Sequence, residues 1–343
     1  MRLRIQRTLN QEICHYADPS LTITSRYNQI FVKSRGHQYM VQLPEDALWK
    51  RVVSPSRLAR RALRLDKCNV RPVGKDLVII RQGRVFHYAG ESHKLTFTMQ
   101  LKNCRNILHQ SIAVRNNQQL YFGEYGHNPK RDPVPVYRSI DGGKTWTTVF
   151  TFEKGQAKHV HGCFYDRFED KIWVLTGDYD GECHMVCAAP DFSDVEWIGD
   201  GRQVFRACNL FFEADAVHWI MDSHLQVSHH VKLNRKTRAI EIGQPFPGPV
   251  WYIKRLDDGF YLAATAQEIG PGVLDRSVHL MASRDMKTWE DVSCFEHDGF
   301  SKRFFKFGVL GFADGHQDSL SFFIFGEAIR GLDGKVALCA LEP

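Results

Sequence analysis

The chain has 343 residues, of which 43% are hydrophobic and 24% are charged, and its formal net charge is +6. These values predict a soluble globular protein. They exclude a transmembrane helix, because no apolar run approaches the ~20 residues that one needs. They also disfavour nucleic acid as a partner, since no focused basic stripe occurs outside one short segment. The mild positive balance favours anionic partners.

The N-terminal stretch MRLRIQRTLN is basic and has neither an apolar core nor a small-residue cleavage site, so it does not predict a secretory signal. The nine cysteines include no Cys-x-x-Cys pair and lie inside apolar runs. This usage is typical of small buried thiols in a reducing compartment. We therefore expect a cytoplasmic protein, and a signal removed from a longer chain would leave export open.

One segment, from Pro44 to Asp66, breaks the β pattern of the chain. It predicts one or two short helices, with Leu58, Ala62 and Leu65 on one face. Its arginines predict a solvated basic face around that stripe, and they are Arg57, Arg60, Arg61 and Arg64. The alternative is a peripheral contact with an acidic membrane surface, a glycan or a protein through residues 57–64.

The rest of the chain repeats a polar turn that leads into a strand. Trp146, Trp197 and Trp289 end such turns, and the gaps of 51 and 92 residues fit a period near 46 with one copy missing. A second feature in the same phase is an apolar strand that ends in an acidic residue. Its copies end at Glu124, Asp178, Asp222, Glu268 and Glu327.

Four short strands per ~40–50 residues are typical of a propeller blade. We expect an all-β fold, a single β-propeller domain over residues 1–343 with a basic helical insertion at 44–66. Seven four-stranded blades are predicted, beginning near residues 20, 68, 106, 158, 204, 249 and 305. Six blades are the alternative. The last blade lacks a strand, and RLRIQRT near the N-terminus is expected to supply it, because closure removes an exposed edge.

The stretch SIDGGKTW places Ser139, Asp141 and Trp146 at tight spacing. An aspartate can accept hydrogen bonds from nearby backbone N–H groups and a glycine accepts a positive φ, so a tight turn is predicted here rather than a catalytic site. The pattern resembles the Asp-box of the BNR repeat, which occurs in the sialidase superfamily and in other β-propellers. The resemblance implies a hairpin between the third and fourth strands of a blade, away from the ligand face.

In propellers like these, the ligand site is built from the starts of the innermost strands. His159 and His161 share one face of a predicted strand and can transfer protons, or bind a metal with Asp178 or His109 as third ligand. The alternative is a pair of hydrogen-bonded structural histidines. The acids at strand ends, such as Glu124, predict either a glycosidase pair or caps that hold the loops.

The candidate catalytic residues are His109, His159, His161, Glu124, Tyr125 and Asp178. The candidate substrate-binding residues are Arg71, Arg206, Asn209, Trp251 and Lys306. No cofactor is expected, apart from the option of a divalent metal at the histidine pair.

Together these residues predict a carbohydrate-active enzyme that acts on an acidic glycan of the uronate or sialate type, by glycoside hydrolysis or by β-elimination. The set is similar to that of propeller-type polysaccharide lyases. Strict sialidase activity is disfavoured, because the nearest string to the Arg-Ile-Pro motif is NVRPVG, in which Pro72 directly follows Arg71. The alternative is a non-catalytic binding or assembly module, for example in surface polysaccharide biosynthesis.

Overall fold

The computed structural model describes residues 1–45, 47–301, 304–305 and 307–343. Within these residues the strands form seven four-stranded sheets, and the chain has the predicted all-β, seven-bladed β-propeller fold. The seven-blade prediction is confirmed and the six-blade alternative is wrong. The chain divides into two compact units, unit 1 with residues 1–68, 252–269 and 275–343, and unit 2 with residues 69–251 and 270–274.

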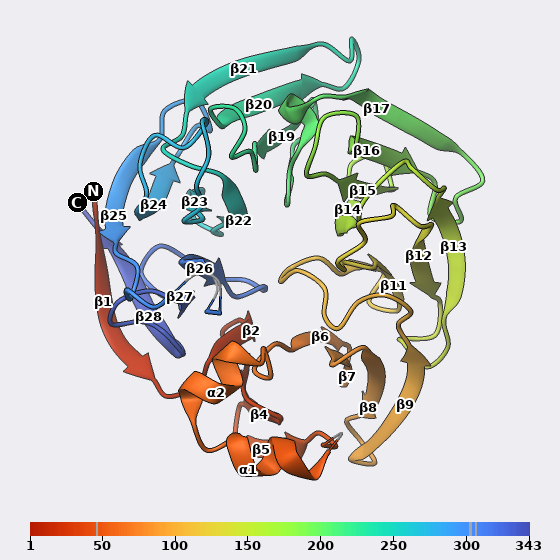
Figure 1. The fold of residues 1–343 in the computed structure, drawn as a ribbon, viewed down its shortest axis with the longest axis vertical. Coiled ribbons are helices and arrows are strands. Elements are labelled where there is room, and N and C mark those ends of the chain that lie inside the picture. Colours follow the sequence, from red (N-terminus) through yellow and green to blue (C-terminus); the bar gives the residue numbers. More distant parts are fainter. Residues whose placement is uncertain (46, 302–303, 306) are drawn as a thin grey trace. The chain divides into compact units, whose positions relative to one another are not determined.

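Unit 2 contains four sheets that follow one another along the chain, with the strands of each in sequence order (Figure 1). Their strands are β6 (Asn69–Val73), β7 (Asp76–Arg81), β8 (Arg84–Ala89) and β9 (Lys94–Gln100); β10 (Ala113–Arg115), β11 (Gln119–Gly123), β12 (Val134–Ser139) and β13 (Thr147–Phe152); β14 (Val160–Asp166), β15 (Lys171–Thr176), β16 (Cys183–Ala188) and β17 (Val195–Gly201); and β18 (Phe211–Phe212), β19 (Ala216–Ile220), β20 (His229–Asn234) and β21 (Ile240–Pro245). A short 3₁₀ helix, η1 (Gln203–Phe205), precedes β18.

Unit 1 contains the other three sheets, except for the first two residues of β22, which belong to unit 2. Their strands are β2 (Ile13–Ala17), β3 (Leu21–Arg26), β4 (Gln29–Ser34) and β5 (His37–Gln42); β22 (Val250–Arg255), β23 (Tyr261–Thr265), β24 (Val278–Ser283) and β25 (Glu290–Phe295); and β26 (Val309–Phe312), β27 (Phe322–Glu327), β28 (Lys335–Glu342) and β1 (Arg2–Leu9). The first sheet begins at Ile13 rather than near residue 20, because the turn at Asp18, whose Oδ1 accepts from Ser20 N and Leu21 N at 2.7 Å, lies inside the sheet.

The N-terminal strand completes the last sheet, as predicted. β1 pairs antiparallel with β28, from Arg2 opposite Glu342 to Leu9 opposite Val336. The pairing gives the hydrogen-bonding edge of β28 a partner, and β1 becomes the outer strand of the sheet.

The stretch SIDGGKTW forms a turn between β12 and β13, the third and fourth strands of their sheet. Asp141 Oδ1 accepts hydrogen bonds from the backbone N–H of Lys144 at 3.0 Å and Thr145 at 2.9 Å. Gly143 has a φ of 91°, and its carbonyl accepts from Trp146 Nε1 at 3.2 Å. The Asp141 carboxylate and the Trp146 indole N–H therefore both serve the turn, and the prediction of a turn is confirmed.

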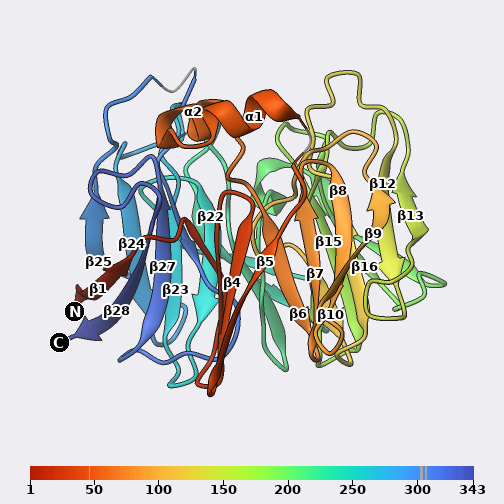
Figure 2. The same cartoon turned by 90° about the horizontal axis from the view of Figure 1, so that it is seen from below.

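The segment after β5 forms two short helices, α1 (Leu48–Val53) and α2 (Arg57–Ala62), which lie at one end of the β2–β5 sheet (Figure 2). The prediction of a solvated basic face is wrong for its central arginines. Arg60 and Arg61 are 4% and 5% exposed, whereas Leu58 is 43% exposed. The reason is a set of acidic side chains beneath the helix, which attract the guanidinium groups inward.

None of the described helices is long and apolar enough to cross a membrane.

Candidate functional site

His159, His161 and Asp178 come together at one end of the β14–β17 sheet, inside unit 2. His159 immediately precedes β14, and Asp178 follows the neighbouring strand β15. The register between the two strands shifts between Val160 and Gly162, so His161 is the extra residue of a β-bulge. A bulge re-aims a side chain and is common beside functional sites.

Asp178 is the centre of the cluster. Its Oδ1 lies 3.5 Å from Nε2 of His159, 3.5 Å from Nε2 of His161 and 3.4 Å from Nη2 of Arg206. Its Oδ2 accepts from Lys158 Nζ at 2.5 Å. The backbone φ of Asp178 is 143°, a conformation that L-residues rarely adopt. Such strain persists only where the surroundings hold it, and it occurs preferentially at functional sites.

The charge state of Asp178 follows from these contacts. Burial by itself would raise the pKa of this carboxyl, but the adjacent His159 and His161 side chains hold the pKa far below its usual range. The group is therefore a permanent carboxylate near neutral pH and is unsuited to act as a general acid.

The orientation of both imidazoles is set by backbone carbonyls. Nδ1 of His159 lies 3.0 Å from the Gly126 oxygen, and Nδ1 of His161 lies 2.9 Å from the Ala207 oxygen. A carbonyl only accepts, so each Nδ1 carries a hydrogen and donates it. Each Nε2 then faces the carboxylate, and Nε2 of His159 is buried and makes no hydrogen bond of normal geometry with a described residue.

Both histidines are buried, and the surroundings of His161 shift its pKa. His161 is 1% exposed, and burial, His159 and Arg206 together lower its pKa, although Asp178 opposes this. His161 is therefore largely neutral at pH 7. The ring of Tyr125, which follows β11, lies 4.1 Å from the His159 ring, centroid to centroid. Because Tyr125, Lys158 and Asp178 are only partly buried, they form the solvent-facing edge of the cluster.

Arg206 joins the cluster to a second carboxylate behind it. Its Nε lies 3.3 Å from Oδ2 of Asp222, and its Nη1 donates to the backbone oxygen of Asp178 at 3.0 Å. The Cys208 thiol donates to the same Asp222 Oδ2 at 3.2 Å. Burial, followed by the charge of Asp222, raises the pKa of Cys208 well above its usual value, so this thiol is no nucleophile.

Sequence reasoning selected five residues that the structure brings together, namely Tyr125, His159, His161, Asp178 and Arg206. It did not select four others that complete the cluster, namely Lys158, Cys208, Asp222 and His224, whose Nδ1 lies 3.4 Å from Nη1 of Arg206. Asp222 carried a usable signal, because it occupies the same repeat phase as Asp178. The remaining three had none, since their roles depend on loops whose path the repeat does not predict.

Glu124 has a different role from its neighbours. Its carboxylate accepts from the backbone N–H of Lys102 and Asn103, both at 2.7 Å, and from the Tyr137 hydroxyl at 2.8 Å. Three strong donors occupy a side chain that is fully buried. This geometry favours the loop-capping alternative over a glycosidase pair.

The remaining candidates lie elsewhere or at the margin. Asn209 Nδ2 is 3.5 Å from Oε1 of Gln110, so it approaches the loop that carries the half-buried His109. Arg71 in β6 and Trp251 in β22 are half-buried in the first strands of two other sheets. Lys306 lies outside the described residues.

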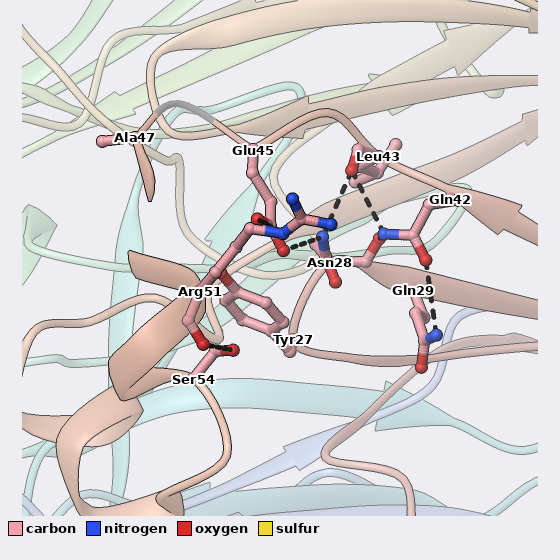
Figure 3. A pocket seen from close by; sticks show the side chains of 9 residues that line it. All are labelled: Tyr27, Asn28, Gln29, Gln42, Leu43, Glu45, Ala47, Arg51 and Ser54. Atoms are coloured by element: carbon pink, nitrogen blue, oxygen red, sulfur yellow. Dashed lines mark hydrogen bonds and ion pairs between the residues drawn. The ribbon is translucent and has the colours of Figure 1, made fainter. Parts of the chain in front are cut away.

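A cavity of about 700 Å³ lies in unit 1, beside α1 and the β2–β5 sheet (Figure 3). Asn28 Nδ2 donates to the Leu43 oxygen at 3.3 Å and to Glu45 Oε1 at 3.2 Å. The polar groups that line the cavity therefore bond largely to each other. Its lining residues are Tyr27, Asn28, Gln29, Gln42, Leu43, Glu45, Ala47, Arg51 and Ser54. Since no histidine is among them, this cavity is a weaker candidate for proton transfer.

Neither a family model nor a curated protein gives a significant match to the chain. Among solved structures, one named as the extracellular domain of a hybrid two-component system from B. thetaiotaomicron aligns with a TM-score of 0.56 and 9% identity, over 98% of this chain and 39% of that one. The tricorn protease aligns with a TM-score of 0.51 and 13% identity, over 98% of this chain and 36% of that one. The chain thus spans well under half the length of both, and these likenesses show the β-propeller fold alone.

Proposed function

We propose that the Asp178 cluster of unit 2 is the proton-transfer centre of an enzyme that acts on acidic glycans, by β-elimination next to a uronate carboxylate. The observation that carries the proposal is the state of His159. Its Nδ1–H is tied to a backbone carbonyl, so its basic nitrogen is Nε2, and that atom is next to Tyr125 and short of a normal hydrogen bond.

The charges of the cluster suit an anionic substrate. Lys158, at the solvent-facing edge, and the buried Arg206 both contact Asp178 and supply permanent positive charge. A uronate carboxylate that replaced Asp178 as the partner of Lys158 or Arg206 would be neutralised. This would make the proton on the adjacent carbon, C5, more acidic. In the elimination, Nε2 of His159 takes that proton from C5, the C4–O bond breaks and a C4–C5 double bond forms, while the leaving oxygen takes a proton from the Tyr125 hydroxyl or from water.

Hydrolysis by two carboxylates is less well supported. That chemistry needs one carboxyl that holds a proton near neutral pH. The pKa of Asp178 is held far below that range, and the Glu124 carboxylate is consumed by loop hydrogen bonds. Because of the turn at Ser139–Trp146, our proposal includes a relationship to BNR/Asp-box propellers. It does not include sialidase chemistry.

The decisive test is an ultraviolet absorbance assay on a panel of uronate-containing polysaccharides, which detects the unsaturated sugar that elimination leaves. The wild type should produce a rise, and His159→Ala should reduce the rate by at least about a hundredfold. His316→Ala, an exposed histidine in unit 1, serves as the control and should leave the rate unchanged. A flat trace with retained glycan binding would support the non-catalytic binding or assembly module instead.

A second candidate is a divalent metal at His159, His161 and Asp178. Ligand bonds of about 2.0–2.2 Å in tetrahedral geometry put neighbouring ligand atoms about 3.3 Å apart. The two Nε2–Oδ1 separations of 3.5 Å are close to this value, and both Nδ1–H groups donate to carbonyls as metal-bound histidines do. A metal there would supply Lewis-acid stabilisation of the substrate carboxylate, while Lys158 and Arg206 would give up part of their contact with Asp178.

Titration of chelator-treated protein with Co²⁺ distinguishes the two candidates. A visible absorption band that His161→Ala abolishes would support the metal. The absence of binding at millimolar Co²⁺, together with full activity in chelator, would leave the proton-transfer proposal alone.

A further inference from the structure

The helix α2 buries charged side chains and exposes apolar ones. Arg60 and Arg61 are buried, whereas Leu58 and Leu63 are 43% and 39% exposed. A surface helix in water shows the opposite distribution, because burial of apolar area is favourable and burial of charge is costly. The outward face of α2 is therefore poorly suited to water.

Ion pairs fix this inverted orientation. Arg60 Nη2 lies 2.5 Å from Oε1 of Glu12, and its Nε donates to Oδ1 of Asp66 at 2.8 Å. Arg61 pairs with Asp298, and its guanidinium lies 5.6 Å from the centroid of the Phe300 ring. Because these partners belong to other segments of unit 1, α2 cannot rotate its leucines inward without breaking the ion pairs.

The exposed apolar surface continues beyond α2. On α1, Trp49 is exposed and Val52 is 80% exposed, and both helices lie at the same end of the β2–β5 sheet (Figure 2). Arg61 also ties the loop after β25 to α2, through Phe300 and Phe305, and Phe300 and Phe304 of that loop are exposed. We name this surface the apolar cap, and its residues are Trp49, Val52, Leu58, Leu63, Phe300 and Phe304.

Basic residues are interleaved with the apolar cap. Lys50 and Arg51 precede Val52 on α1, and Arg64 and Lys67 follow Leu63. Arg51 pairs with Glu45 at 3.0 Å, so its charge is partly offset. The loop sequence SKRFFKF alternates aromatic with basic residues, of which Lys302, Arg303 and Lys306 lie outside the described residues.

We propose that the apolar cap docks onto the headgroup region of an anionic lipid bilayer. Short helices that carry tryptophan, valine and leucine outward, next to lysine and arginine, match an interface that is apolar below and negatively charged above. The basic side chains would meet lipid phosphates, while the apolar ones enter the acyl boundary. The proposal concerns unit 1 and is independent of the chemistry at Asp178.

Co-sedimentation with phosphatidylcholine vesicles, with and without phosphatidylglycerol, tests the proposal. The wild type should bind vesicles that contain phosphatidylglycerol, and binding should weaken as salt is raised. Val52→Ser/Leu58→Ser should lower the partition coefficient at least about tenfold, because both apolar side chains lose their insertion energy. The matched control is Leu320→Ser, which removes another exposed leucine of unit 1 and should bind like the wild type.

A charge variant completes the design. Lys50→Glu/Arg64→Glu should remove the preference for phosphatidylglycerol while the thermal unfolding midpoint stays within a few degrees of the wild type. Absence of binding to every vesicle, or equal binding by the Val52→Ser/Leu58→Ser variant, would overturn the proposal. So would a wild type that forms dimers, seen by light scattering, that the same variant dissociates without any lipid binding.

Discussion

Gly177 and His161 are in such close contact that a Cβ on Gly177 would stand 2.8 Å from the Cε1 atom of the His161 ring, and 3.0 Å from Cγ of Arg206. The arrangement of the side chains around Asp178 therefore leaves no room for a Cβ at position 177. Gly177 lets the chain after β15 pass close to the buried side chains of His161 and Arg206, which both face the Asp178 carboxylate.

Gly177→Ala should therefore displace His161 and Arg206, with a loss of about 1–3 kcal/mol in the free energy of unfolding. Nitrogen-15 spectra of the imidazoles should show that the His161 tautomer signal shifts. Gly181→Ala is the control for the histidine signals, since a Cβ there meets nothing within 4 Å, and its φ of 85° opposes the change only through local backbone strain. Unchanged histidine signals in Gly177→Ala would refute the steric role.

The three tryptophans of the repeated turns provide a graded test of packing. Trp289 is 4% exposed, Trp146 is half-buried and Trp197 is 42% exposed. Replacement by alanine should cost about 3–5 kcal/mol at Trp289 and progressively less at Trp146 and Trp197, because the lost burial decreases in that order. Urea denaturation of the three variants measures this. Equal costs would show that the turns, rather than indole burial, determine stability.

The inward arginine of α2 should be far more important for stability than an outward one. Arg60→Ala removes the buried guanidinium that pairs with both Glu12 and Asp66 and leaves Arg57 as their remaining partner, so it should cost about 3 kcal/mol. Arg51→Ala breaks an ion pair whose arginine is largely exposed and should cost less than about 1 kcal/mol. Thermal unfolding of both variants decides this, and similar midpoints would contradict the buried network.

His218 in β19 predicts a specific pH dependence of stability. Burial, followed by the charge of Lys232, lowers the pKa of His218 to about 4, while Asp215 opposes this. Its unfolded pKa is about 6.5. Between these values the unfolded state binds more protons, so this contribution is present above pH 6.5 and is lost as the pH falls toward 4, by at most about 3 kcal/mol.

Denaturation at several pH values in this window measures that slope. His218→Asn should be less pH-dependent than the wild type, whereas His316→Gln, an exposed histidine, should not differ from it. A slope in His218→Asn identical to the wild type would assign the dependence to other groups.

The blades could be predicted from sequence because each one repeats its own turn and strand signals. Trp146 and the strands that end in an acidic residue showed where each blade repeat begins. The positions of His161, Asp178 and Arg206 within their repeats then predicted that the three lie at the same end of the sheets. The bulge at His161 and the strained φ of Asp178 could not be predicted, since both depend on tertiary contacts rather than on residue type. The prediction that the arginines of α2 face solvent was wrong for the same reason, because their partners Glu12 and Asp298 are distant in sequence.

The pairing of β1 with β28 has a consequence for how the chain acquires its structure. Residues 2–9 pair with residues 335–342, so this contact joins two segments that are far apart in the sequence. Closing so long a loop makes the pairing a slow step of folding. Until the two strands meet, β1 is an unpaired strand that can associate with other chains.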